Sequence, residues 1–238
     1  YQVLGAIISG AIAYDLTGSS VKSIPNAQGL TQPVAVFSGS TRTGISCAPP
    51  LGGSGDLMMQ QVFPYQLWGK KYLTAPFNNS TGLGLFMTCI YRVMVKDITT
   101  VVYRNGVALS SSSLIDGRYY EFISNTADYI TSDKPVIVAQ YMSSTNGCPN
   151  TSGDGDPEMF YLSPLTAAIP QTAFYRNSMQ AINSNYLTLI IPTPGLSSLK
   201  IDGQAFNHPG SVTMTYPHTN YPGYTVVARK WNAANAQC

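Results

Sequence analysis

The chain has 238 residues, of which 44% are hydrophobic and only 10% are charged, and its formal net charge is +2. This composition excludes a disordered chain, because disorder requires low hydrophobicity together with high charge. A nucleic-acid-binding protein is disfavoured, since the chain has no basic run with which to neutralise phosphates. The charged fraction is well below the usual value of about 25% and implies a surface of uncharged polar residues, as is common in extracellular proteins.

The first half of the chain is predicted to form β-strands. Residues 3–13 are an apolar run that is too short to span a bilayer, and we interpret them as a buried strand. Apolar and polar residues alternate over 91–95, which is the pattern of a half-buried strand. A β-branched and aromatic segment over 99–103 is followed by Asn105-Gly106, which favours a tight hairpin turn.

The second half shows the same kind of pattern. A strand predicted over 186–191 stops at Pro192, and a second hairpin is indicated where residues 199–201 meet Asp202-Gly203. Apolar and polar residues alternate again over 212–216. Nowhere do apolar residues keep a helical spacing for three turns. We therefore expect an all-β fold with little or no helix and no membrane span.

An internal repeat with a spacing of about 100 residues is the most informative feature of the sequence. The segment around Pro33-Val34-Ala35-Val36 matches the segment around Pro135-Val136-Ile137-Val138. Further matches occur in the same order: Tyr14-Asp15-Leu16 with Tyr120-Glu121-Phe122, Cys47 with Cys148, Gly55-Asp56 with Gly155-Asp156, Met59 with Met159, and Pro64 with Pro164. An ordered series of this kind indicates a duplication. We predict two tandem, related β-sandwich-like units, residues 1–117 and 118–238.

The four cysteines are Cys47, Cys89, Cys148 and Cys238, and none of them forms the closely spaced pair typical of zinc sites. An even number of cysteines in a chain of extracellular composition suggests disulfides, with three possible pairings. We prefer Cys47–Cys89 and Cys148–Cys238, because each bond then closes one predicted unit. Four buried free thiols are the alternative. Glycosylation sequons at Asn78, Asn79 and Asn150 agree with secretion.

One acidic stretch is a candidate metal site. Asp154, Asp156 and Glu158 place three carboxylates at alternate positions, and calcium favours such oxygen clusters in loops. The alternative is a turn in which Asp156 accepts hydrogen bonds from backbone N–H groups. We favour the turn, because Asp56 recurs at the equivalent place in the first unit without the other two acids. No other cofactor is predicted.

The 16 tyrosines suggest a recognition surface, because tyrosine offers a large contact area at a low cost in conformational entropy. Tyr216, Tyr221 and Tyr224 lie close together among prolines and a glycine, and we predict a binding surface there. The alternative is that these rings complete the core of a sandwich and reach solvent only with their hydroxyl groups.

The sequence offers little catalytic machinery. Gly53-Ser54-Gly55 does not satisfy the G-x-S-x-G pattern of a nucleophile elbow. His208 and His218 both neighbour a proline and are expected in loops. We therefore predict that the protein is not an enzyme. A polysaccharide hydrolase is a distant alternative, since such an enzyme needs a pair of carboxylates and no pair stands out among the 11 acids.

Several segments together resemble a known domain family. They are residues 32–39, Trp68-Gly69-Lys70, Tyr91-Arg92-Val93 with Thr99-Thr100-Val101, residues 133–141, Gly155-Asp156-Pro157 with Met159, and residues 161–164. In this order they resemble the family named after the N-terminal region of IgGFc-binding protein, from about Leu30 to the C-terminus. The resemblance implies a secreted, non-enzymatic module of mucus, adhesive and cell-surface proteins. It supplies no set of binding residues.

Two functions follow as hypotheses. The first is an extracellular interaction or adhesion module that binds protein or glycan ligands. The second is a structural subunit of an extracellular fibre or coat, which would assemble through β-strand edges. Low charge reduces repulsion between copies, and the apolar run 3–13 is a candidate donor segment for such self-assembly.

Overall fold

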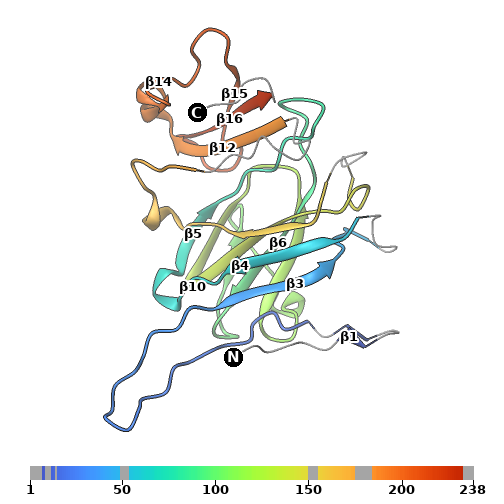
Figure 1. Ribbon diagram of the computed structural model, residues 1–238, viewed down its shortest axis with the longest axis vertical. Coiled ribbons are helices and arrows are strands. Elements are labelled where there is room, and N and C mark those ends of the chain that lie inside the picture. The colour runs from blue at the N-terminus through green and yellow to red at the C-terminus, as the bar shows by residue number, and fades with distance from the viewer. Residues whose placement is uncertain are drawn as a thin grey trace.

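The computed structural model describes residues 7–8, 12–13, 15–48, 54–149, 155–174 and 184–232, and β-strands dominate them (Figure 1). The all-β prediction is confirmed, because every helical segment among these residues is a short 3-10 helix. These segments are η1 (Tyr65–Leu67), η2 (Ser111–Ser113), η3 (Leu165–Ala167) and η4 (Thr193–Ser198). Among the predicted site residues, Asn150, Asp154 and Cys238 lie outside the described residues.

A seven-stranded sheet forms the centre of the molecule. It contains β5 (Gly69–Leu73), β6 (Cys89–Val95), β7 (Val102–Arg104), β8 (Val107–Ala108), β9 (Tyr119–Ser124), β10 (Tyr129–Met142) and β11 (Glu158–Tyr161). The long strand β10 organises this sheet, because it pairs antiparallel with β5, β6, β7 and β11.

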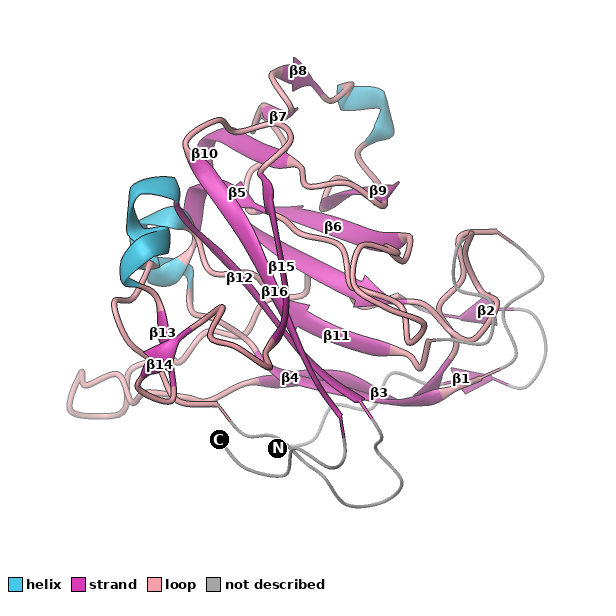
Figure 2. Ribbon diagram, turned by 90° about the horizontal axis from the view of Figure 1, so that it is seen from above, coloured by secondary structure: helices cyan, strands magenta, loops and turns pink. Residues whose placement is uncertain are grey.

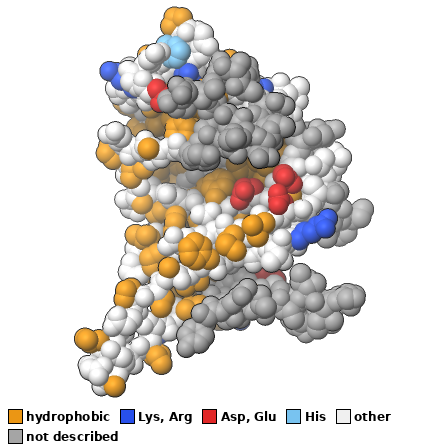
Figure 3. All heavy atoms as spheres, in the orientation of Figure 1, with side chains coloured by type: hydrophobic (Ala, Val, Ile, Leu, Met, Phe, Trp, Pro, Cys, Tyr) orange, Lys and Arg blue, Asp and Glu red, His pale blue; other side chains and the backbone are white. Residues whose placement is uncertain are grey.

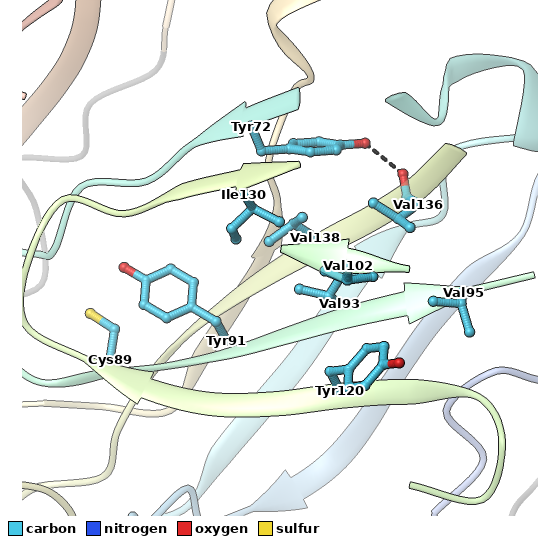
Figure 4. Packing of buried hydrophobic residues seen from close by; sticks show 10 residues of the cluster. All are labelled: Tyr72, Cys89, Tyr91, Val93, Val95, Val102, Tyr120, Ile130, Val136 and Val138. Atoms are coloured by element: carbon cyan, nitrogen blue, oxygen red, sulfur yellow. Dashed lines mark hydrogen bonds between the residues drawn. The ribbon is translucent and has the colours of Figure 1, made fainter. Parts of the chain in front are cut away.

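The middle of β10 is buried on both faces, as its apolar sequence predicts for a strand inside a packed layer. Val136 and Val138 lie in a core cluster with Tyr72 and Tyr91 (Figure 4). The Tyr72 hydroxyl donates to the Val136 carbonyl at 2.7 Å and accepts from the Gly69 N–H at 2.9 Å. The polar end of this ring is therefore satisfied inside the core, and burial raises the pKa of Tyr72 to about 12.

Both predicted hairpin turns are present. Asn105 and Gly106 have φ values of 53° and 82° and join β7 to β8. Asp202 and Gly203 have φ values of 54° and 75° and join β13 (Lys200–Ile201) to β14 (Gln204–Ala205). Positive φ at both central positions is what a type I′ turn requires, and Asn-Gly and Asp-Gly meet this requirement at low cost.

A three-stranded sheet forms the C-terminal part of the chain. It has the order β12 (Ser184–Pro192), β16 (Tyr224–Asn232), β15 (Val212–Pro217) and lies across the upper end of the central sheet (Figures 1 and 2). One face packs Val227 and Trp231 against residues of η4 and of the β13–β14 hairpin. On the opposite side, Val226 packs against Ala75 and Ala127, which attaches this sheet to the central one.

The N-terminal part contributes two small hairpins. β1 (Ile7–Ile8) pairs with β2 (Ile12–Ala13), and β3 (Phe37–Thr43) pairs with β4 (Asp56–Gln61). The prediction of one continuous strand over 3–13 is therefore wrong for its described part, which forms two short strands paired with each other. The rest of that run lies outside the described residues.

The predicted boundary at residue 117 does not separate two sheets. Strands β5 to β8 precede it and β9 to β11 follow it, yet all seven belong to one sheet. The physical reason is β10, which pairs on one side with strands from the first predicted unit and also with β11 from the second. The division into 1–117 and 118–238 is therefore not a division into independent sandwiches, and the duplication itself stays a prediction.

The predicted cysteine pairing is wrong. The structure joins Cys47 to Cys148, which excludes both Cys47–Cys89 and Cys148–Cys238. Cys89 is a free, buried thiol on β6 and packs in the cluster around Tyr91. The two bonded cysteines instead follow β3 and β10 and meet in a separate cluster. The pairing failed because the chain brings equivalent positions of the two predicted units together instead of closing each unit on itself.

Candidate binding surface and ligand pocket

The β3–β4 and β10–β11 hairpins have matching registers. In the first, Phe37 lies opposite Gln61 and Gly39 opposite Met59; in the second, Ala139 lies opposite Tyr161 and Tyr141 opposite Met159. These pairs are the ones that the sequence repeat makes equivalent. Each hairpin is followed by a proline and a single 3-10 turn, η1 or η3. Local sequence therefore produces the same structure twice.

The two hairpins differ in what covers them. Directly opposite residues in an antiparallel pair share a face, so Phe37, Met59 and Leu57 lie on one face of β3–β4. Their side chains are 62%, 58% and 52% exposed, and we call this surface the Phe37 face. The equivalent Ala139 and Met159 are only 5% and 7% exposed.

The cover on the second hairpin comes from the first. Met58, on the opposite side of β4 from Met59, belongs to the same buried cluster as Ala139 and Met159. Ile45 and the cystine Cys47–Cys148 also pack there, and β4 lies against β11. The first hairpin thus covers the second, and no described residue of the chain covers the Phe37 face in the same way.

The Phe37 face is part of a longer exposed apolar surface. Figure 3 shows hydrophobic side chains along β3 and β4 and on the segment that precedes them. Leu30 and Val34 in that segment are also exposed. Phe37, Leu57 and Met59 themselves lie on neighbouring positions of two paired strands, and an exposed apolar patch marks an interaction site more often than a scattered apolar residue does.

A pocket of about 450 Å³ lies next to η1, and we call it the Trp68 pocket. It is lined by Tyr65, Trp68, Lys96, Asp97, Thr100, Lys134 and Pro135. The Tyr65 and Trp68 rings meet edge to face with centroids 4.6 Å apart. The Trp68 indole N–H donates to the Phe63 carbonyl at 3.2 Å, which fixes the orientation of the ring.

Charged groups line the rim of the Trp68 pocket. The Lys134 ammonium pairs with the Asp97 carboxylate at 2.5 Å and also contacts the Thr99 hydroxyl. The hydrogen bond from Lys134, reinforced by those from Thr99, lowers the pKa of Asp97 to about 2. The Lys96 ammonium lies 4.6 Å from the centre of the Tyr65 ring, in a cation–π contact.

The predicted acidic cluster is only partly visible. Asp156 and Glu158 are described, whereas Asp154 is not. Burial, followed by the negative charge of Asp56, raises the pKa of Asp156, so the two equivalent aspartates lie close together. No group of three potential metal ligands gathers among the described residues. Calcium at this place stays a prediction.

The predicted tyrosine surface is used largely within the molecule. Tyr221 lies between Tyr129 on β10 and Tyr224, with ring centres 4.4 Å and 5.2 Å away. Tyr216 packs against Phe86 at 5.1 Å. These contacts attach the C-terminal sheet to the central part of the molecule and leave all three rings half-buried. A binding role for them stays a prediction.

The family model described as IgGFc binding protein matches residues 1–236. The chain belongs to the IgGFc-binding protein family. The resemblance inferred from the sequence is thus confirmed over nearly the whole chain. Neither a curated protein nor a solved structure matches the chain in the corresponding searches.

Three of the sequence motifs that resemble the IgGFc-binding family meet at the Trp68 pocket. Trp68, Thr100, Lys134 and Pro135 come from three of these motifs and line one cavity. Sequence reasoning missed the pocket because its residues are spread over more than 70 positions in the chain. The clustering of family-like motifs with exposed aromatic and charged residues was the only signal that could have pointed to it.

The glycosylation sites differ in access. Asn78 is buried, and its side-chain oxygen accepts the Gly84 N–H at 2.9 Å, which leaves little room for a glycan in the fold. Asn79 is half-buried and accepts the Thr81 N–H at 3.1 Å. A glycan at Asn79 stays a prediction, and Asn150 lies outside the described residues.

Within the part of the chain that the structure describes, neither histidine ring forms a hydrogen bond with the side chain of a serine, threonine or cysteine. His218 is buried between the central and C-terminal sheets, and burial lowers its pKa. His208 is exposed, and its Nε2 lies 3.2 Å from an Arg229 Nη2. Among the described residues, no serine hydroxyl forms a hydrogen bond with either ring. No described helix is long and apolar enough to cross a bilayer.

Proposed function

We propose that the protein is a secreted, non-enzymatic interaction module that binds a partner protein through the Phe37 face. The family supports an extracellular binding role of this general kind. The disulfide supports an oxidising compartment, because such bonds persist mainly in secreted proteins. The ligand and the residues that bind it are the new part of the proposal.

The observation that carries the proposal is the contrast between two equivalent hairpin faces. On β10–β11, the equivalent Ala139 and Met159 are buried, whereas Phe37, Leu57 and Met59 on β3–β4 remain more than half exposed. Covering such side chains contributes roughly 1 kcal/mol each, since about half of the 1.5–3 kcal/mol for full burial is still available. Within the molecule, the apolar side of β4 that carries Met58 covers the second hairpin. The partner that fits the Phe37 face is therefore a protein with a similar apolar β-hairpin surface.

A panel of secreted proteins that includes immunoglobulin Fc tests this proposal, with binding measured by surface plasmon resonance. Phe37→Ser and Met59→Gln should each weaken binding about tenfold or more, as loss of a central apolar contact does at interfaces. Val107→Ser, at an equally exposed valine on β8, is the matched control and should leave binding unchanged. A chain that binds no protein on the panel but hydrolyses a polysaccharide would refute the proposal.

A fibre or coat subunit is the second candidate, and one observation favours it. Among the described residues, β3 pairs only with β4, so its other edge has no strand partner. A free edge next to an apolar face can accept a strand from another copy. Light scattering at rising concentration should then show growing assemblies that Phe37→Ser suppresses. A monomer at every concentration would count against this candidate.

A further inference from the structure

We propose that the Trp68 pocket binds a pyranose residue that carries a carboxylate or a sulfate group. This inference rests on the proposed role as a binding module and assigns to it a glycan site separate from the Phe37 face. The volume of about 450 Å³ falls in the usual range of small-ligand pockets and suits one or two sugar rings.

The aromatic wall supplies the surface on which a sugar ring can lie. The C–H faces of a pyranose are weakly positive and apolar, whereas aromatic faces are negative, so the two stack with little desolvation cost. Tyr65 is exposed and is braced edge to face by Trp68 at 4.6 Å. The hydrogen bond from Trp68 to Phe63 holds this pair in place before a ligand arrives, which lowers the entropy cost of binding.

The hydrogen-bonding groups of the pocket favour an anion over a neutral sugar. The Asp97 carboxylate already accepts hydrogen bonds from the Lys134 ammonium and from the Thr99 N–H and hydroxyl. The Thr100 hydroxyl is also occupied, because it donates to the Asp97 carbonyl at 2.6 Å. The side-chain acceptors in the pocket are therefore largely satisfied, and what remains open is donors.

Those donors are cationic. The Lys96 ammonium forms no hydrogen bond or ion pair with the residues that the structure describes, and it lies 4.6 Å from the centre of the Tyr65 ring. It keeps three N–H donors for a ligand. With Lys134 and Asp97 nearly balancing each other, Lys96 leaves the pocket with a formal charge of +1. An acidic group on a stacked sugar ring would meet this charge directly.

The backbone also directs Lys134 toward the pocket. The pairing of β10 with β5 shifts register between Thr131 and Val136, and Lys134 and Pro135 lie in this irregular stretch. Such irregularities re-aim side chains next to functional sites. Trp68, Thr100 and Lys134 therefore meet from three separate segments, each of which carries part of the family resemblance.

Calorimetry with matched oligosaccharides tests the assignment on the full chain. The probes are a uronic-acid oligosaccharide, a sulfated oligosaccharide and a neutral oligosaccharide of the same length. We expect the acidic probes to bind at least tenfold more tightly than the neutral one, with affinity falling as salt is raised. A change in tryptophan fluorescence should accompany binding, because Trp68 lines the pocket. The two acidic probes show whether carboxylate or sulfate is preferred.

Two variants and a control locate the site. Lys96→Gln should weaken binding of the acidic probes about tenfold, and Tyr65→Leu should weaken it at least as much. Lys70→Gln removes the same charge from an exposed lysine on β5 outside the pocket and should have little effect. Equal losses for Lys70→Gln and Lys96→Gln would overturn the assignment, as would equal affinity for acidic and neutral probes.

The outcome is separable from that for the proposed function. If no sugar binds while Phe37→Ser still abolishes binding of a partner protein, the pocket assignment fails and the interaction module stands. If acidic sugars bind through Lys96 while the Phe37-face variants change nothing, the pocket assignment holds and the protein-binding proposal fails.

Discussion

The β3–β4 and β10–β11 hairpins show how far a repeated sequence determines structure. In both, the pairing of the two strands starts directly after a Pro-Val-x-Val segment, has the same register and is followed by a proline and a 3-10 turn. Yet Val136 is completely buried and the equivalent Val34 is 57% exposed. Local pairing follows from the repeated residues, whereas burial depends on which strands the rest of the chain places alongside.

Equivalent positions also meet each other in space. Arg92 holds both Asp15 and Glu121, with N–O distances of 2.8 Å and 2.7 Å. The acids Asp15 and Glu121 are one pair of the sequence repeat, and Cys47 and Cys148 are another, joined here by a disulfide. Contacts between matching positions are what two fused copies of a self-associating ancestor would leave, and the duplication itself stays a prediction.

Removing the disulfide is expected to have the largest effect on this comparison. The bond closes a loop with a sequence separation of 101 residues, and loops of that size stabilise by up to about 4–5 kcal/mol. Cys47→Ser combined with Cys148→Ser should lower the free energy of unfolding by roughly 2–5 kcal/mol in urea titrations. Reductant should lower the free energy of unfolding of the native chain by the same amount and should leave that of the double variant unchanged. A further loss of stability in the reduced double variant would contradict the assigned disulfide.

A smaller effect distinguishes the two hairpins directly. Val136→Ala should cost about 2 kcal/mol, because it removes two methyl groups from a fully buried site. Val34→Ala is the matched change in the first hairpin and should stay within about 0.5 kcal/mol, because that side chain is already exposed. Urea unfolding of both variants measures the difference. Equal costs would mean that the first hairpin is covered in solution, as in a self-assembled form.

These comparisons indicate what sequence alone could predict. The turns at Asn105-Gly106 and Asp202-Gly203 were predictable, because their backbone conformation depends on the residues at the turn itself. The disulfide was not, because it depends on β3 and β10 ending near each other in space. The exposure of Val34 could not be distinguished from the burial of Val136, since the two sequences are alike. The Trp68 pocket was missed for the same long-range reason.

The next expected effect concerns pH and the C-terminal sheet. His218 is 2% exposed, and burial lowers its pKa despite the nearby charge of Asp128. The folded chain therefore keeps this ring neutral where the unfolded chain takes up a proton. Stability should be full above about pH 6.5 and should fall as the pH drops below that value, until the folded-state pKa is reached.

Thermal unfolding between pH 5 and 8 measures this dependence. His218→Gln should flatten the profile below pH 6.5, whereas His208→Gln, at an exposed ring, should leave it in place. Amide exchange should show that loss of protection begins in β15 and β16, which flank His218, and spares β3–β4 and β10–β11. A profile unaffected by His218→Gln would disprove this explanation.

The smallest effect is expected from the paired aspartates of the two hairpins. Burial and the charge of Asp56 raise the pKa of Asp156, so the charged form of Asp156 is disfavoured in the folded chain. Asp56→Asn should lower the Asp156 pKa toward its ordinary value and slightly increase stability near neutral pH. NMR titration of the Asp156 carboxyl carbon measures the shift. An unchanged pKa would show that the two carboxylates do not interact.

The Cys47–Cys148 bond also has a consequence for proteolysis. Any single cut between residues 48 and 147 leaves both pieces covalently tethered, because the crosslink spans that whole interval. A nicked molecule would therefore migrate as an intact chain on a gel until it is reduced. In a protease-rich environment, a module of this design can lose a peptide bond in an exposed turn and still keep its two hairpins attached to each other.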